Sequence, residues 1–179
     1  PIKVVLTGKG KVGFGAKEIL DGMKMKEVSI EKFLSKEFDE PVYVHIDVED
    51  YYRKIDGTEG SFEDFKKNAS AYESDFEKFS KVADIFIAGH FYKDGSPKIL
   101  TKEMLNNANN AIKVVADVSC DIDGPIDSTI RVSTIADPIY GYYPRENKEV
   151  PVDHPAAVVV MAVDNLPCEL PKDASEGFG

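Results

Sequence analysis

Early in the chain the sequence reads Val4-Val5-Leu6-Thr7-Gly8-Lys9-Gly10-Lys11-Val12-Gly13-Phe14-Gly15, and this run is the strongest indication of the fold. A β-branched segment enters a glycine-rich turn, and a helical pattern begins directly after it, with apolar side chains at Ala16, Ile19, Leu20 and Met23. Apolar residues at these spacings predict the buried face of a helix. The run therefore predicts a strand, a tight turn and a helix in immediate succession.

The three glycines Gly8, Gly10 and Gly13 have the G-x-G-x-x-G spacing of a dinucleotide-binding turn. We expect Gly8 to permit the tight turn, Gly10 to adopt positive φ and let a pyrophosphate approach the backbone, and Gly13 to let the helix pack closely on the strand. The N-terminus of the helix then offers unpaired N–H groups to the phosphates. Any glycine-rich turn can match this spacing by chance, but its position between a strand and a helix favours a dinucleotide site.

The composition excludes several other classes of function. The net charge of −10 and the lack of a basic patch argue against a nucleic-acid partner. The longest apolar run, near residues 156–163, is too short to cross a membrane, and with no signal peptide evident we expect a cytoplasmic protein. The aspartates around Gly124 lack the spacing of a calcium loop, so no metal site is predicted.

Further strands are predicted along the chain at residues 28–31, 42–47, 84–89, 112–118 and 157–163. Ser61 is expected to cap a helical stretch whose core-facing residues include Tyr72, Phe76, Phe79 and Ala83, and Thr101 is expected to cap a shorter helix. Alternation of apolar strands with helices predicts an α/β fold, doubly wound, with a mainly parallel Rossmann-type sheet and helices on both faces. We expect a single nucleotide-binding domain, residues 1–179, cut from a two-domain protein.

Polar residues follow the ends of several predicted strands, where ligands bind in such sheets. Glu31 follows the second strand, 18 residues after Gly13, which is close to the offset of the carboxylate that binds a ribose 2′-OH in NAD-binding domains. Lys32 could instead meet the 2′-phosphate of NADP. A carboxylate at the strand end slightly favours NAD. His90, which ends another strand, is a second candidate for the site.

Three later motifs carry a resemblance to a known family. They are A-D-V-S-C-D at residues 116–121, S-T-I-A-D-P at residues 133–138, and A-V-D-N-L-P-C-E-L-P-K-D-A-S-E at residues 162–176. Together they make the chain similar, from Lys3 to Gly179, to the saccharopine dehydrogenase and lysine-oxoglutarate reductase family. The fold of that family is similar to that of alanine dehydrogenase and the transhydrogenase alpha subunit. Members form or cleave saccharopine by hydride transfer with NAD or NADP, and their nucleotide domain is inserted into a substrate domain.

The resemblance also implies particular roles for residues of this chain. It places cofactor contacts at Gly10, Lys11, Phe91, Val118, Val163, Asp164, Asn165 and Leu166, and places Asp121 close to the nicotinamide. Relatives commonly have tyrosine at the position of Phe91. The family's acid and base, a lysine and a histidine, belong to the substrate domain, so the catalytic residues are not assigned here. The implied partner is a small amino-acid and 2-oxoacid substrate, reached through that second domain, and oligomerisation is left open.

Two other functions fit the same residues. One is an alanine-dehydrogenase-like domain that acts on a smaller amino acid. The other is a sensor that binds a dinucleotide without catalysing a reaction.

Overall fold

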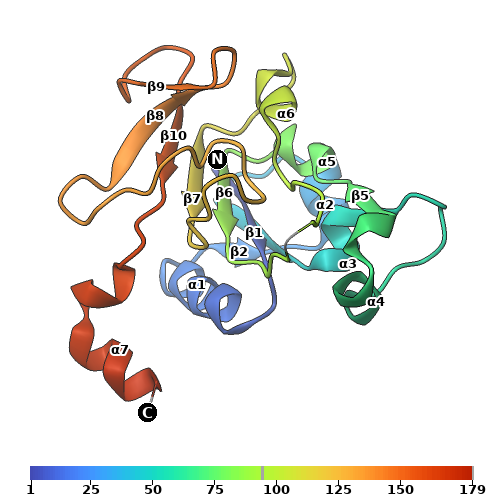
Figure 1. The fold of residues 1–179 in the computed structure, drawn as a ribbon, viewed down its shortest axis with the longest axis horizontal. Coiled ribbons are helices and arrows are strands. Elements are labelled where there is room, and N and C mark those ends of the chain that lie inside the picture. The colour runs from blue at the N-terminus through green and yellow to red at the C-terminus, as the bar shows by residue number, and fades with distance from the viewer. Residues whose placement is uncertain (94, 179) are drawn as a thin grey trace.

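A single twisted sheet forms the centre of the computed structural model, which describes residues 1–93 and 95–178 (Figure 1). Its strand order is β2-β3-β1-β6-β7-β10-β8-β9. The strands are β1 (Lys3–Thr7), β2 (Lys26–Glu27), β3 (Val42–Ile46), β6 (Ile85–Ala88), β7 (Val114–Asp117), β8 (Ile139–Tyr143), β9 (Lys148–Val150) and β10 (Val158–Met161). All run in the direction of β1 except β8, which is antiparallel to both of its neighbours, β10 and β9. The predicted doubly wound, mainly parallel α/β sheet is confirmed.

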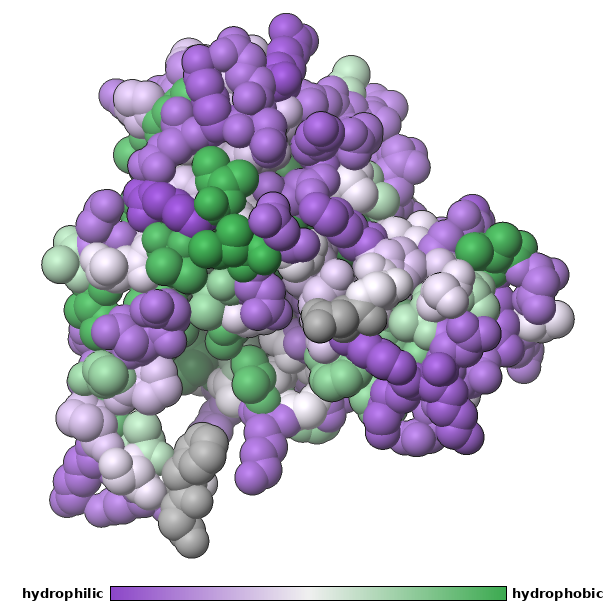
Figure 2. Space-filling view, in the orientation of Figure 1, coloured by the Kyte–Doolittle hydropathy of each residue, from purple (hydrophilic) through white to green (hydrophobic). Residues whose placement is uncertain are grey.

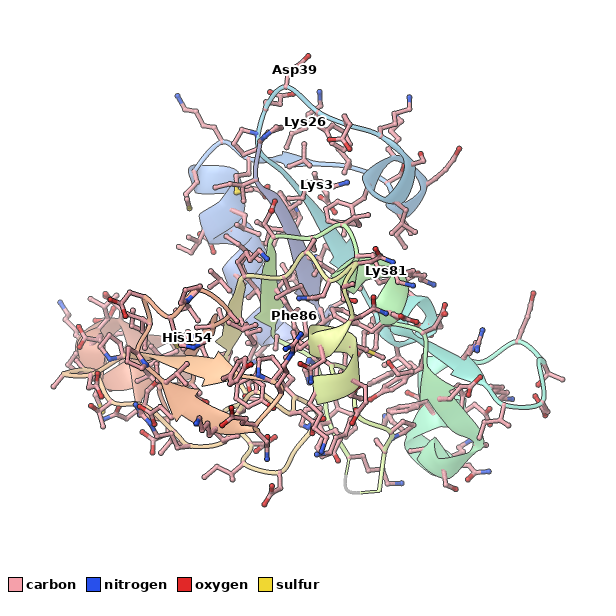
Figure 3. The ribbon with its side chains drawn as sticks, turned by 90° about the horizontal axis from the view of Figure 1, so that it is seen from above. Lys3, Lys26, Asp39, Lys81, Phe86 and His154 are labelled. Carbon is pink, nitrogen blue, oxygen red and sulfur yellow. The ribbon has the colours of Figure 1, made fainter. Side chains whose placement is uncertain are left out.

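Helices cover both faces of this sheet, with α1 (Lys11–Gly22) and α2 (Ile30–Ser35) on opposite sides in Figures 1 and 3. On one side, Leu20 of α1 shares a buried cluster with Val4 and Leu6. The larger cluster, on the other side, includes Phe33 of α2 and Phe86, which lies near the centre of the molecule in Figure 3. The predicted apolar face of α1 is only partly buried, because Leu20 faces the sheet whereas Ile19 and Met23 are exposed.

The predicted strand at residues 28–31 is wrong. The edge strand β2 covers only Lys26–Glu27 and ends before this range, and Ser29 then caps α2 by accepting a hydrogen bond from the Lys32 N–H. The serine side chain satisfies a free N–H at the helix start, so the chain leaves the sheet edge early. Glu31 consequently lies in the first turn of α2 and does not end a strand.

A long excursion, residues 48–74, separates β3 from the next helix before β6. It contains α3 (Val48–Tyr51), β4 (Tyr52–Lys54), α4 (Phe62–Lys67), the 3-10 turn η1 (Ala69–Ala71) and β5 (Tyr72–Ser74), and α5 (Glu77–Ser80) follows. Ser61 caps α4 as expected, and Thr101 caps α6 (Lys102–Asn106). The expected continuous helix is interrupted because β5 pairs with β4, although Tyr72, Phe76 and Phe79 are buried as predicted.

The last part of the chain extends the sheet and then leaves it. The antiparallel hairpin of β8 and β9 was not expected from the sequence. After β10 come the 3-10 turn η2 (Leu166–Glu169) and the helix α7 (Pro171–Phe178). In Figure 1, α7 stands apart from the strands. Figure 2 shows hydrophilic residues over most of the visible face, with the largest hydrophobic patch on its left half and a smaller one near its right edge. No helix in the described part of the chain is long and apolar enough to cross a membrane.

Candidate functional site

The carboxyl ends of the central strands form one aligned edge. Thr7 pairs with Ile46 and with Ala88, and Ala88 pairs with Asp117, so β1, β3, β6 and β7 end level with one another. The chain moves from β1 to β3 on one side and then to β6 on the other, which makes β1 the point where the strand order reverses. Ligands of open α/β sheets bind in the crevice at such a point.

The glycine turn after β1 is closely packed at two positions. Gly8 has φ of +91°, and a Cβ there would lie 2.3 Å from the carbonyl oxygen of Gly89. A Cβ on Gly13 would lie 1.7 Å from the carbonyl oxygen of Gly8. His45 Nε2 is 2.7 Å from that same oxygen and, in the tautomer that carries its proton on Nε2, donates a hydrogen bond to it. The turn therefore has the tight bend and the close helix-to-strand packing predicted for Gly8 and Gly13.

Gly10 differs from its neighbours in the turn. It is the N-cap of α1 with φ of −94° and ψ of −172°, so the expected positive φ is wrong. A Cβ built on it would meet nothing within 4 Å. Gly10 therefore faces open space, and with no cap side chain the first N–H groups of α1 are accessible to an anion.

A groove of about 430 Å³ lies over this turn. It is lined by the turn, by the residue after β3 and by the segment after β6: Gly8, Lys9, Gly10, Lys11, Val12, Asp47, Phe62, Gly89, His90 and Phe91. Four of the predicted cofactor contacts, Gly8, Gly10, Lys11 and Phe91, thus come together in one groove. A set of glycine N–H groups, a cation and a carboxylate has the chemistry that a pyrophosphate and a ribose require.

The carboxylate in this groove is Asp47, which the sequence analysis did not select. One of the two strands that flank β1 is β3, and Asp47 is the first residue after it. Its Oδ1 accepts the Val48 N–H at 2.9 Å, which fixes the side chain at the start of α3. Glu31 lies elsewhere, because α2 runs toward the amino end of β1, where Lys3 Nζ donates to the Phe33 carbonyl at 2.5 Å. The signal in the sequence was an acidic residue at the end of the strand predicted at residues 42–47.

His90 forms part of the wall of the groove. Its Nδ1 lies 2.9 Å from Thr7 Oγ1, which ties the segment after β6 to the end of β1. Burial lowers the pKa of His90 to about 4, so the imidazole is neutral near pH 7. Among the described residues its Nε2 has no hydrogen-bond partner. In this structure His90 therefore orders the edge of the sheet and adds no charge to the groove.

The remaining predicted contacts lie on the β7 and β10 side of the same edge. The buried carboxylate of Asp117 accepts the N–H groups of Ser119 at 3.1 Å and Cys120 at 3.2 Å, and the hydroxyl of Thr129 at 2.6 Å. These bonds shape the loop that contains Val118 and, one residue beyond Cys120, Asp121. Burial, and then nearby carboxylates, raise the pKa of the Cys120 thiol.

The segment after β10 reaches this edge as well. Val163 is buried and bridges to Ser133, whereas Asp164, Asn165 and Leu166 are exposed. These residues share an edge with the groove but do not line it. The edge thus has two halves, one beside the glycine turn and one beside the ends of β7 and β10. Across the described residues, no group of His, Cys, Asp and Glu side chains could hold a metal ion.

Comparison with known proteins matches this chain to a family model, to curated relatives and to a solved structure. The sequence model of the family "Alanine dehydrogenase/PNT, C-terminal domain" matches residues 1–179. A saccharopine dehydrogenase [NAD(+), L-lysine-forming] of Schizosaccharomyces pombe is 33% identical over 106 residues, which cover 54% of this chain and 25% of that protein. A mitochondrial alpha-aminoadipic semialdehyde synthase of Rattus norvegicus is 25% identical over 204 residues, covering 100% of this chain and 22% of that protein.

Among solved structures, an L-alanine dehydrogenase shares the fold. Its TM-score is 0.51 at 18% sequence identity, and the match covers 98% of this chain and 40% of that one. The chain spans about a quarter of the length of the curated relatives described above.

Proposed function

Because the chain belongs to the alanine dehydrogenase/PNT C-terminal domain family, we propose that it binds a nicotinamide dinucleotide along the carboxyl edge of its sheet. The observation that carries this proposal is Gly10, whose backbone faces open space at the start of α1 in the groove. A pyrophosphate needs such an approach to the N-terminus of a helix.

Each half of the edge then has a role. The N–H groups at the start of α1 and the Lys11 cation hold the pyrophosphate, and Asp47 accepts a hydrogen bond from the ribose 2′-OH. Val118, Asp121 and residues 163–166 face the nicotinamide half, because they end β7 and β10 on the far side of β1. The dinucleotide supplies hydride transfer when bound, and the protein positions it.

The substrate we propose is an amine or imine derived from an amino acid, of the saccharopine-forming or saccharopine-cleaving type. The names of the curated relatives support this assignment to lysine metabolism. The alanine dehydrogenase structure, at 18% identity, indicates the fold alone and does not favour the alternative of a smaller amino acid. The chain spans about a quarter of its curated relatives, and we propose that the proton donor and acceptor belong to parts of those proteins that this chain does not match.

Titration of this chain with NADH tests the proposal. We expect binding with a Kd from about 10 μM to about 1 mM, because one wall of a cleft leaves the nicotinamide in water. With lysine and 2-oxoglutarate added, NADH absorbance should stay constant, since a missing acid and base cost several powers of ten in rate. Undetectable binding at about 10 mM NADH would contradict the function, and steady NADH oxidation would show that the catalytic groups lie within these residues.

The cofactor preference should depend on Asp47. We propose that NADH binds at least about tenfold more tightly than NADPH, because Asp47, Glu49 and Asp50 place three carboxylates after β3, where the extra phosphate would lie. Asp47→Asn keeps a good helix cap and removes one charge, so this preference should fall by about tenfold.

Competition titrations of the two cofactors measure this change. Glu31→Gln is the matched control, because it removes the same charge from α2 and should leave the preference as in the parent. Tighter binding of NADPH by the parent, or an equal effect of the two substitutions, would contradict the assignment of Asp47.

A further inference from the structure

The segment after β6 is supported from outside the sheet by the excursion, residues 48–74. Lys93 Nζ donates to the Lys66 carbonyl at 2.6 Å, and Tyr52 Oη donates to the Pro97 carbonyl at 2.5 Å. Slightly further along, Ser74 Oγ donates to the Ile99 carbonyl at 2.9 Å. The excursion therefore holds Lys93, Pro97 and Ile99, although it contributes no strand to the central sheet.

Two aromatic side chains meet in the groove where the excursion reaches this segment. The ring centroids of Phe62 and Phe91 are 6.1 Å apart, and the ring planes are nearly perpendicular, at 81°. Phe62 is the first residue of α4, its N–H donates to Glu49 Oε1 at 2.7 Å, and Lys66 Nζ lies 5.1 Å over its ring. Phe62 is thus held in place, whereas Phe91 is 50% exposed and lines the groove. An apolar ring left half open in a groove is available to a flat ligand.

The position of Asp47 indicates which part of a dinucleotide comes to this ring. The 2′-OH that such a carboxylate binds belongs to the adenosine ribose, where NADP carries its extra phosphate. Asp47 and Phe91 line the same groove, on opposite sides of the glycine turn, after β3 and β6. If Asp47 binds this ribose, the adenosine half is expected in this groove, with the purine on the side where Phe62 and Phe91 meet.

We propose, on the basis of the function proposed above, that Phe91 is the stacking surface for the adenine ring and that Phe62 is the positioning residue that orients it. An aromatic side chain stacks on the face of any purine without needing hydrogen bonds. The excursion thereby sets the affinity for the adenosine half of the cofactor. ADP-ribose, which lacks the nicotinamide, should bind nearly as well as NADH, and reduced nicotinamide mononucleotide should bind far more weakly.

Calorimetric titration of these three ligands tests the proposal. Phe91→Ala should weaken ADP-ribose and NADH equally, by about tenfold, or about 1.4 kcal/mol, which lies within the range for stacking one base on an aromatic side chain. The affinity of the Phe91→Ala variant for reduced nicotinamide mononucleotide should equal that of the parent. Phe91→Tyr should keep parental affinity, and Phe62→Ala should weaken ADP-ribose by about threefold, since the Phe91 ring remains but is less ordered.

Ile55→Ala is the control for removal of an exposed apolar side chain from the excursion, because Ile55 is 64% exposed and lies outside the groove. Thermal unfolding of each variant checks that the fold is retained. Unchanged ADP-ribose affinity in Phe91→Ala, or an equal loss for the mononucleotide, would overturn the stacking role while the proposed function stands. A parent chain that binds neither NADH nor ADP-ribose would instead overturn the proposed function itself.

Discussion

Gly13→Ala is expected to destabilise the protein by about 3–5 kcal/mol, which corresponds to a fall of about 6–20 °C in the unfolding midpoint. The added Cβ would lie 1.7 Å from the Gly8 carbonyl oxygen, and 3.2 Å from His45 Nε2. The obstacle at 1.7 Å is backbone, which a rotamer change cannot move, so α1 must shift away from β1. That shift would also open the packing of Leu20 against Val4 and Leu6.

Gly15→Ala is the matched control, two residues further along the same helix. A Cβ at Gly15 meets nothing within 4 Å, and alanine is favoured over glycine inside a helix by about 0.5–1 kcal/mol. Thermal unfolding of the two variants should therefore show opposite signs. Equal midpoints would mean that α1 does not pack on the glycine turn as the structure has it.

Gly10→Val should abolish dinucleotide binding while the protein stays folded. Valine fits the extended backbone at Gly10, and its side chain would enter space that is open in the structure. The only cost to stability is a poorer N-cap, about 0.5–1 kcal/mol. The isopropyl group would occupy the approach of the pyrophosphate, so NADH affinity should fall at least about 100-fold, or about 2.7 kcal/mol.

Titration with NADH beside thermal unfolding measures both effects. Gly15→Val introduces the same side chain at an exposed position of α1 outside the groove, and should bind NADH as the parent does. If the folded Gly10→Val variant binds NADH with parental affinity, the turn is not the pyrophosphate site.

Local features of the sequence were enough to predict the centre of the sheet. The strand, glycine turn and helix at residues 3–22 were recognisable because each depends on short-range chemistry, namely β-branching, tight bends at glycine and apolar spacing. The same holds for β3, β6, β7 and β10, and for the caps at Ser61 and Thr101. The motifs near residues 116, 133 and 162 were sufficient to indicate the family that residues 1–179 match.

Errors arose where an element depends on a partner distant in the sequence. The helical spacing of Tyr72, Phe76 and Phe79 correctly identified core residues, but pairing with β4 makes Tyr72 part of a strand. The hairpin of β8 and β9 is stabilised by its pairing with β10, which the local pattern does not reveal.

The choice between Glu31 and Asp47 shows the same division most clearly. By itself, the sequence determined that a glycine turn with the spacing of a dinucleotide-binding motif follows β1 and that acidic residues lie further along the chain. Only the tertiary structure decided which carboxylate shares the groove, because a short edge strand and α2 precede β3, and β3 is the strand that pairs with β1. The contact between Phe62 and Phe91 likewise depends on how the excursion folds back. Strand order and the meeting of distant segments follow from the packing of the whole core, whereas a motif spacing describes only neighbours along the chain.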